Sequence, residues 1–147
     1  FGNPDSMPQA IRQFCSETGQ PVPETPGETI RCALESLALK YQSVLGMLES
    51  LTGGAIEIVH VVGGGTQNKL LCQMTADACR RPVIAGPMEA TAIGNLLVQL
   101  IANGAVASVS EAREIVSNSF ISDSFTPDTS YDWNGAAERF AGILGKT

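Results

Sequence analysis

The feature that most constrains the fold is a run of β-branched residues that ends in three consecutive glycines. Residues 56–62 are Ile-Glu-Ile-Val-His-Val-Val, a pattern typical of a strand covered on both faces in a parallel sheet. Gly63, Gly64 and Gly65 follow at once, and residues 66–79 show the apolar spacing of a helix. Residues 82–86 form a second short apolar run. This order of strand, helix and strand predicts an α/β fold with a parallel strand pair.

Helical patterns dominate the rest of the chain. The clearest covers residues 26–51, where six large apolar residues recur at spacings of four and three: Ile30, Leu34, Leu37, Tyr41, Val44 and Leu48. Thr25 and Glu28 have the spacing of a capping box, with Pro26 at the first helical position. Further helices are expected at residues 7–18, 88–103, from 108 onward and 130–144. Residues 117–129 are polar, and no element is expected there.

Composition excludes several classes of protein. The chain has 147 residues with 44% hydrophobic residues, which is enough for a core and excludes wholesale disorder. Its net charge of -6, without a basic run, predicts no nucleic-acid partner. The longest weakly charged run is broken by Pro, Gly and Asn residues, so no membrane span is expected. The four cysteines and single histidine lack metal-ligand spacing, and no metal site is expected. The first residues show no secretory signal and no initiating Met, which predicts a cytoplasmic protein and a piece of a longer chain.

The glycine cluster is the candidate site, and two interpretations compete for it. Glycines let a backbone approach a ligand closely, and the helix behind them offers unpaired N–H groups to an anion. Only three residues join the strand to the helix, so at least one glycine is expected in a conformation open chiefly to glycine, and a side chain at Gly64 is expected to strain the turn. The alternative is a tight turn without a ligand. A dinucleotide fingerprint fails, because Asn68 replaces its third glycine and no acid ends the second strand. The crevice of actin-like ATPases and sugar kinases has an amide side chain one turn into the helix, where Asn68 is expected to lie.

Residues 61–68 and 70–78 resemble the C-terminal nucleotide element of the FGGY carbohydrate kinases, with the strings Val-Val-Gly-Gly-Gly-Thr-Gln-Asn and Leu-Leu-Cys-Gln-Met-Thr-Ala-Asp-Ala. Residues 14–21, 35–41 and 85–95 resemble the members of this family that phosphorylate L-rhamnulose. The resemblance covers about residues 1–125. It implies that the chain is the C-terminal part of an actin-like, ribonuclease H-like sugar kinase domain, a mostly helical fragment with a short parallel strand pair.

The resemblance also implies an activity, transfer of the ATP γ-phosphate to the 1-hydroxyl of L-rhamnulose, with ATP and Mg²⁺ held in a cleft between two domains. The implied ATP-binding residues are Gly63, Gly64, Gly65 and Asn68. Gly64 matches the family's ATP-contacting glycine, and Asn68 matches the position on the adenine side. The catalytic aspartate motif lies earlier in the full protein. No catalytic residue is therefore expected in this chain, and the acids Asp77, Asp123, Asp128 and Asp132 are assigned no role.

This interpretation places residues 1–147 in the second kinase domain. It divides them into a loop with a short helix (1–25), a long helix (26–51), the nucleotide element (56–104) and C-terminal helices (108–147). The expected partners are the N-terminal portion of the same kinase and the nucleotide, with a homodimer left open. Two alternatives remain. One is another FGGY kinase that acts on fuculose or xylulose, and the other is a non-catalytic α/β fragment for packing and oligomerisation.

The cysteines offer one candidate disulfide. Cys15 and Cys32 flank residues 20–26, a loop with three prolines, and each lies on the apolar face of an expected helix. The two can therefore come close enough to bridge, although a cytosol would keep them mostly reduced. The resemblance agrees, since some members of the family carry cysteines at both positions. Cys72 and Cys79 are seven residues apart on one expected helix, which is too far for a direct bridge.

Overall fold

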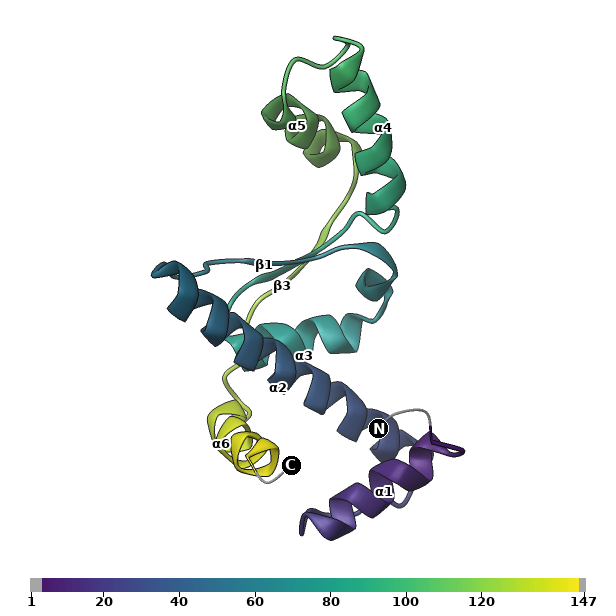
Figure 1. Ribbon diagram of the computed structural model, residues 1–147, viewed down its shortest axis with the longest axis vertical. Helices are drawn as coiled ribbons and strands as arrows, with labels where there is room; N and C mark the ends of the chain where they lie inside the picture. Colours follow the sequence, from purple (N-terminus) through teal and green to yellow (C-terminus); the bar gives the residue numbers. More distant parts are fainter. Residues whose placement is uncertain (1–3, 146–147) are drawn as a thin grey trace.

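The computed structural model describes residues 4–145, in which two helices lie beneath a small sheet and a pair of helices stands above it (Figure 1). The elements in chain order are α1 (Met7–Glu17), α2 (Pro26–Thr52), β1 (Val59–Val61), the 3₁₀ helix η1 (Gly63–Gln67), α3 (Lys69–Cys79), β2 (Val83–Ala85), α4 (Ala90–Ala102), α5 (Val109–Ser119), β3 (Asp123–Phe125) and α6 (Trp133–Leu144). Helices α2 and α3 lie under the sheet, whereas α4 and α5 form the upper pair.

Both ends of helix α2 are set by residues close to them in the sequence. The Thr25 hydroxyl oxygen accepts a hydrogen bond from the Glu28 N–H at 3.2 Å, and the Glu28 carboxylate accepts one from the Thr25 N–H at 2.9 Å. This is the predicted capping box, which satisfies two N–H groups at the helix start. Gly53, at a φ of 68°, ends the helix in the left-handed conformation. The predicted long helix is therefore confirmed and extends one residue further, to Thr52.

The capping box makes the stability of α2 depend on pH. The backbone N–H groups of Thr25 and Glu24 lower the pKa of Glu28. A lowered pKa in the folded state stabilises the fold above the ordinary glutamate pKa, and this contribution is lost as the pH falls through the folded pKa. We therefore expect Glu28→Gln to destabilise the full-length protein at pH 7 in urea denaturation. The difference from wild type should vanish at the acid end of the series. Glu24→Gln, in the same loop, is the control, and a pH-independent difference would contradict the prediction.

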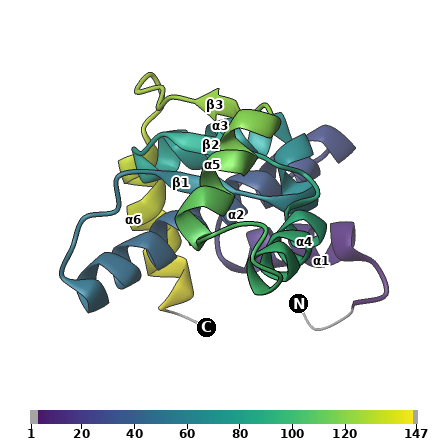
Figure 2. The same ribbon diagram turned by 90° about the horizontal axis from the view of Figure 1, so that it is seen from above.

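The sheet has the strand order β1-β2-β3 (Figure 2). Strands β1 and β2 are parallel, with Val59 opposite Val83, so the predicted parallel pair is confirmed. Strand β3 runs antiparallel to β2, with Phe125 opposite Val83. The expectation that residues 117–129 form no element is therefore wrong. Strand β3 has only three residues, Asp-Ser-Phe, and no apolar alternation long enough to show in the sequence.

Two further boundaries differ from the sequence-based expectation. The first strand was expected over residues 56–62, but only Val59–Val61 pair with β2. Residues 66–79 were expected to form one helix, whereas residues 63–67 form the 3₁₀ helix η1 and α3 begins at Lys69. The tighter turn carries the chain from the end of β1 to the start of α3.

The core lies beneath the sheet in two clusters. The first joins α2, α3 and α6 through the buried side chains of Ala38, Leu39, Met74, Ala78 and Trp133. The second joins α3 to β1 and β2 through Cys72, Ala76, Val83 and Ala85. Helix α4 contributes no buried residue. Residues 63–67, hereafter the glycine loop, are therefore supported from below by α3 and by the parallel strands, which hold the loop at the carboxyl edge of the sheet.

Candidate nucleotide site

The turn after β1 depends on glycine at one position, Gly63. Its φ of 76° lies in the left-handed region that favours glycine. Its N–H donates to the Pro87 carbonyl at 3.2 Å, and its own carbonyl accepts from the Thr66 hydroxyl at 2.8 Å. The sequence-based expectation that at least one of the three glycines adopts this conformation is confirmed.

Gly64 differs from Gly63 because the space where its side chain would lie is open. A Cβ built on Gly64 would meet no atom of residues 4–145 within 4 Å, and the φ of Gly64 is outside the left-handed region. The expectation that a side chain at Gly64 would strain the turn is therefore wrong, and that strain belongs to Gly63. A Cβ on Gly65 would lie 3.6 Å from Cγ1 of Val61, an ordinary contact. The loop thus presents Gly64 to whatever approaches the carboxyl edge of the parallel strands, the edge at which open α/β sheets bind ligands.

Asn68 lies at the junction of η1 and α3. Its N–H donates to the Gly65 carbonyl at 3.2 Å, which joins it to the glycine loop. Its side-chain oxygen accepts from the Leu71 N–H at 3.0 Å, so Asn68 is the N-cap of α3. The expectation that this amide lies one turn into the helix is therefore wrong, because η1 delays the helix start. Among residues 4–145 the side-chain NH₂ group of Asn68 donates to no recorded partner, which leaves it available to a ligand.

A charged pair at the same edge escaped the sequence-based interpretation. Asp123 begins β3 opposite Ala85, and its carboxylate lies 3.3 Å from the Lys69 ammonium group at the start of α3. Both side chains are half exposed or more. The sequence does not predict this ion pair, because the contact depends on strand β3, which has no recognisable pattern.

The described residues do not form a magnesium site by themselves. In residues 4–145 no three His, Cys, Asp or Glu side chains gather closely enough to hold a metal ion. Magnesium in nucleotide sites is bound through one or two carboxylates together with phosphate oxygens and water. For the described ranges, the donor set therefore does not fit a dedicated metal site.

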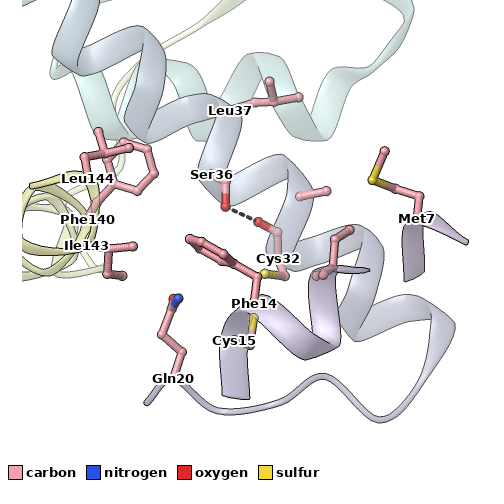
Figure 3. A pocket seen from close by; sticks show the side chains of 12 residues that line it. Met7, Phe14, Cys15, Gln20, Cys32, Ser36, Leu37, Phe140, Ile143 and Leu144 are labelled. Carbon is pink, nitrogen blue, oxygen red and sulfur yellow. Dashed lines mark hydrogen bonds between the residues drawn. The ribbon is translucent and has the colours of Figure 1, made fainter. Parts of the chain in front are cut away.

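The two candidate disulfide cysteines lie away from the glycine loop, in a pocket of about 440 Å³ between α1, α2 and α6 (Figure 3). Apart from Gln20 and Ser36, the labelled side chains around it are apolar or carry thiols. Cys15 is buried and Cys32 half-buried, and both thiols are free. Burial raises the pKa of the Cys32 thiol, and the neighbouring Cys15 thiol raises it further.

We expect Cys15 and Cys32 to form an intramolecular disulfide under oxidising conditions. The loop they close is short, and closing it should stabilise the fold by roughly 3 kcal/mol in the loop-entropy model. Because the thiolate is the reactive form and the pKa of Cys32 is raised, oxidation should be faster at alkaline pH. Alkylation followed by peptide mass spectrometry measures this. Cys79 is the internal control, because burial raises its pKa to about 11. Two alkylatable thiols at positions 15 and 32 after equilibration with oxidised glutathione would contradict the prediction.

Comparison with known proteins identifies the family. The model of the C-terminal domain of the FGGY family of carbohydrate kinases matches residues 1–103. The chain therefore belongs to the FGGY carbohydrate kinases. It has the fold of the C-terminal domain of that family, which here is mostly helical with a small mixed sheet.

Individual relatives carry more specific names. A rhamnulokinase from Bacteroides thetaiotaomicron is 46% identical over 140 residues, which cover 95% of this chain and 29% of the relative. A rhamnulokinase from Pectobacterium carotovorum subsp. carotovorum is 45% identical, with 97% and 29% covered. The crystal structure of a xylulose kinase from Rhodospirillum rubrum matches with a TM-score of 0.66 at 22% identity, covering 87% of this chain and 26% of that one, which supports the fold alone. The chain thus spans about 29% of the length of these two rhamnulokinases.

Within residues 4–145, no helix combines the length and the apolar character needed to cross a membrane.

Proposed function

We propose that the full-length protein transfers the γ-phosphate of ATP to the 1-hydroxyl of L-rhamnulose, and that this chain supplies the adenosine side of the ATP site. The observation that carries the proposal is the 46% identity to a rhamnulokinase across 95% of this chain. Fuculose and xylulose kinases of the same family are the competing assignments.

In this proposal the chain positions the nucleotide and performs no proton transfer. The backbone at Gly64 lies against the nucleotide, a placement supported by the open space that residues 4–145 leave around a Cβ at this position. The NH₂ group of Asn68 donates to the adenosine side while its oxygen holds the start of α3. Phosphoryl transfer depends mostly on positioning and charge stabilisation. The general base and the ligands of Mg²⁺ then belong to the part of the kinase outside this chain.

The main proposed partner is the N-terminal portion of the same kinase. Strand β1 lies at an edge of the sheet formed by the described residues, and a pocket of about 450 Å³ runs beside it between α2 and α3. On α2 the apolar face that the sequence predicts is 36–45% exposed at Leu37, Tyr41, Val44 and Leu48. Both features fit a chain whose remaining apolar contacts come from elsewhere in the kinase. A homodimer and a cytoplasmic location stay predictions, and the four free thiols are consistent with the latter.

We expect residues 1–147 produced alone to self-associate. The exposed face of α2 would then pack against another copy, because burying apolar surface is favourable. Light scattering over a concentration series measures the mass. The full-length kinase is the control and should show a single mass over the same range. A fragment that remains monomeric at the highest concentration would contradict the prediction.

A substrate panel tests the proposed function. The full-length protein is assayed with ATP and Mg²⁺ against L-rhamnulose, L-fuculose and D-xylulose, and kcat/KM is compared. L-Rhamnulose should be preferred, with the product phosphorylated at the 1-position. A higher kcat/KM for L-fuculose or D-xylulose would instead assign the protein the activity of another kinase of this family. Absence of phosphorylation with every sugar would favour a non-catalytic packing role.

A further inference from the structure

The glycine loop is connected to a second segment, the turn at residues 86–88 between β2 and α4. The Gly63 N–H donates to the Pro87 carbonyl at 3.2 Å. The Gln67 side-chain amide reaches from the end of η1 and donates to the Met88 sulfur, across 21 positions of sequence. The Met88 carbonyl oxygen lies 3.9 Å from the place where a Cβ on Gly63 would stand. The turn therefore touches the loop at its first glycine and again at its last residue.

The turn is itself held in place from two sides. The Gly86 N–H donates to the Val61 carbonyl at 2.9 Å, which joins the end of β2 to the end of β1. Gly86 has a φ of 140°, and a Cβ there would lie 3.0 Å from the Ser122 hydroxyl oxygen and 3.3 Å from the Ile121 carbonyl oxygen. The backbone at Gly86 thus packs directly on the chain that enters β3. A turn fixed in this way can act as a support for a loop that rests on it.

We propose that Gln67 and Met88 are positioning residues that set the glycine loop for nucleotide binding. The inference rests on the proposed function, because it assigns the loop to ATP. Both side chains are exposed, so their contact contributes little to the core. Their contact is the side-chain link between the far end of η1 and the 86–88 turn, whereas Gly63 at the near end is held by its backbone. Loss of this contact leaves the loop joined to the 86–88 turn at Gly63, so that Gly64 and Asn68 are held less firmly in place.

A double-mutant cycle in the full-length kinase tests the proposal. The variants are Gln67→Ala, Met88→Ala and the double substitution, and the readouts are the Kd of ATP by calorimetry and the KM values of ATP and sugar. Each single substitution should weaken ATP binding roughly 2- to 3-fold, the low end for one hydrogen bond, because a thioether sulfur is a weak acceptor. The double variant should show the same factor, not its square, because one contact is lost in all three. The kcat and the sugar KM should stay within about twofold, since the proposed function assigns the loop to the nucleotide.

Two further variants sharpen the test. Met88→Gln restores a side-chain acceptor of similar length and should return the Kd of ATP close to the wild-type value. Gln99→Ala is the matched control, because the Gln99 side chain donates to Asn95 within α4. An unchanged Kd in both single variants, a squared effect in the double variant, or an equal rise in the sugar KM would overturn the inference. A wild-type protein that binds ATP without phosphorylating any sugar would refute the proposed function, and the ATP Kd values of the variants would still test the positioning role. A wild-type protein that binds no ATP would refute both the proposed function and the positioning role.

Discussion

Replacing Gly64 by valine in the full-length kinase should weaken ATP binding by about tenfold or more, which corresponds to at least 1.4 kcal/mol. The reason is steric, because a side chain would fill the space that the proposed nucleotide occupies. The free energy of unfolding should change by no more than about 0.5 kcal/mol, the usual range for a surface site. A Cβ at Gly64 meets no described residue within 4 Å, so the valine side chain should cause no clash within the folded protein. Calorimetry with ATP and urea denaturation measure the two quantities separately.

Two other glycines provide the controls. A Cβ on Gly54 also meets none of the residues that the structure describes within 4 Å, and Gly54→Val should alter neither ATP binding nor stability. Gly63→Val, unlike Gly64→Val, should lower the free energy of unfolding, because a φ of 76° strains a β-branched residue by on the order of 1–3 kcal/mol. Normal ATP binding by a folded Gly64→Val variant would show that no ligand approaches this glycine.

Substitutions of Asn68 should separate its two roles. Asn68→Ala removes both the helix cap and the NH₂ donor, and should lower the free energy of unfolding by about 1 kcal/mol. Asn68→Ser retains a good capping oxygen and loses only the amide donor, so stability should be nearly preserved. Both variants should weaken ATP binding by roughly 1–2 kcal/mol, the scale of one buried hydrogen bond. Urea denaturation and the Kd of ATP, both in the full-length kinase, distinguish the two effects.

The capping role alone makes a different prediction. If Asn68 only begins α3 through its bond to the Leu71 N–H, Asn68→Ser should bind ATP like the wild type. Ser108 provides a matched control, because its hydroxyl oxygen accepts from the Glu111 N–H at the start of α5. Ser108→Ala should therefore reduce stability in the way that Asn68→Ala does, without a change in the Kd of ATP.

Elements with local signals were predictable from the sequence. The start of α2 followed from Thr25, Pro26 and Glu28, whose capping contacts span only three residues. The parallel pair followed from two apolar runs separated by one helix, a pattern with few alternative topologies. The family followed from the motif around the three glycines, and the comparison with known proteins confirmed it.

Other features of the site depend on contacts between distant parts of the chain. Strand β3 forms because residues 123–125 pair with the free edge of β2. Three residues are too few to show the alternating pattern by which a strand is predicted. The left-handed conformation fell on Gly63 rather than Gly64 because the Pro87 carbonyl receives the Gly63 N–H. The exposed apolar face of α2 is another such case, since the contacts of that helix decide which of its residues are buried.

The sequence by itself determined the family, the long capped helix, the parallel strands and the run of residues from Gly63 to Asn68 that forms the candidate site. Only the tertiary structure decided which conformation and which contacts each of those residues has. Hydrogen bonds from segments far away in the sequence select among conformations that glycine permits equally well. Asn68 caps α3 through a local bond, since its oxygen accepts from the Leu71 N–H three residues later. The long-range bonds of Gly63 to Pro87 and of Gln67 to Met88 set the loop on the 86–88 turn.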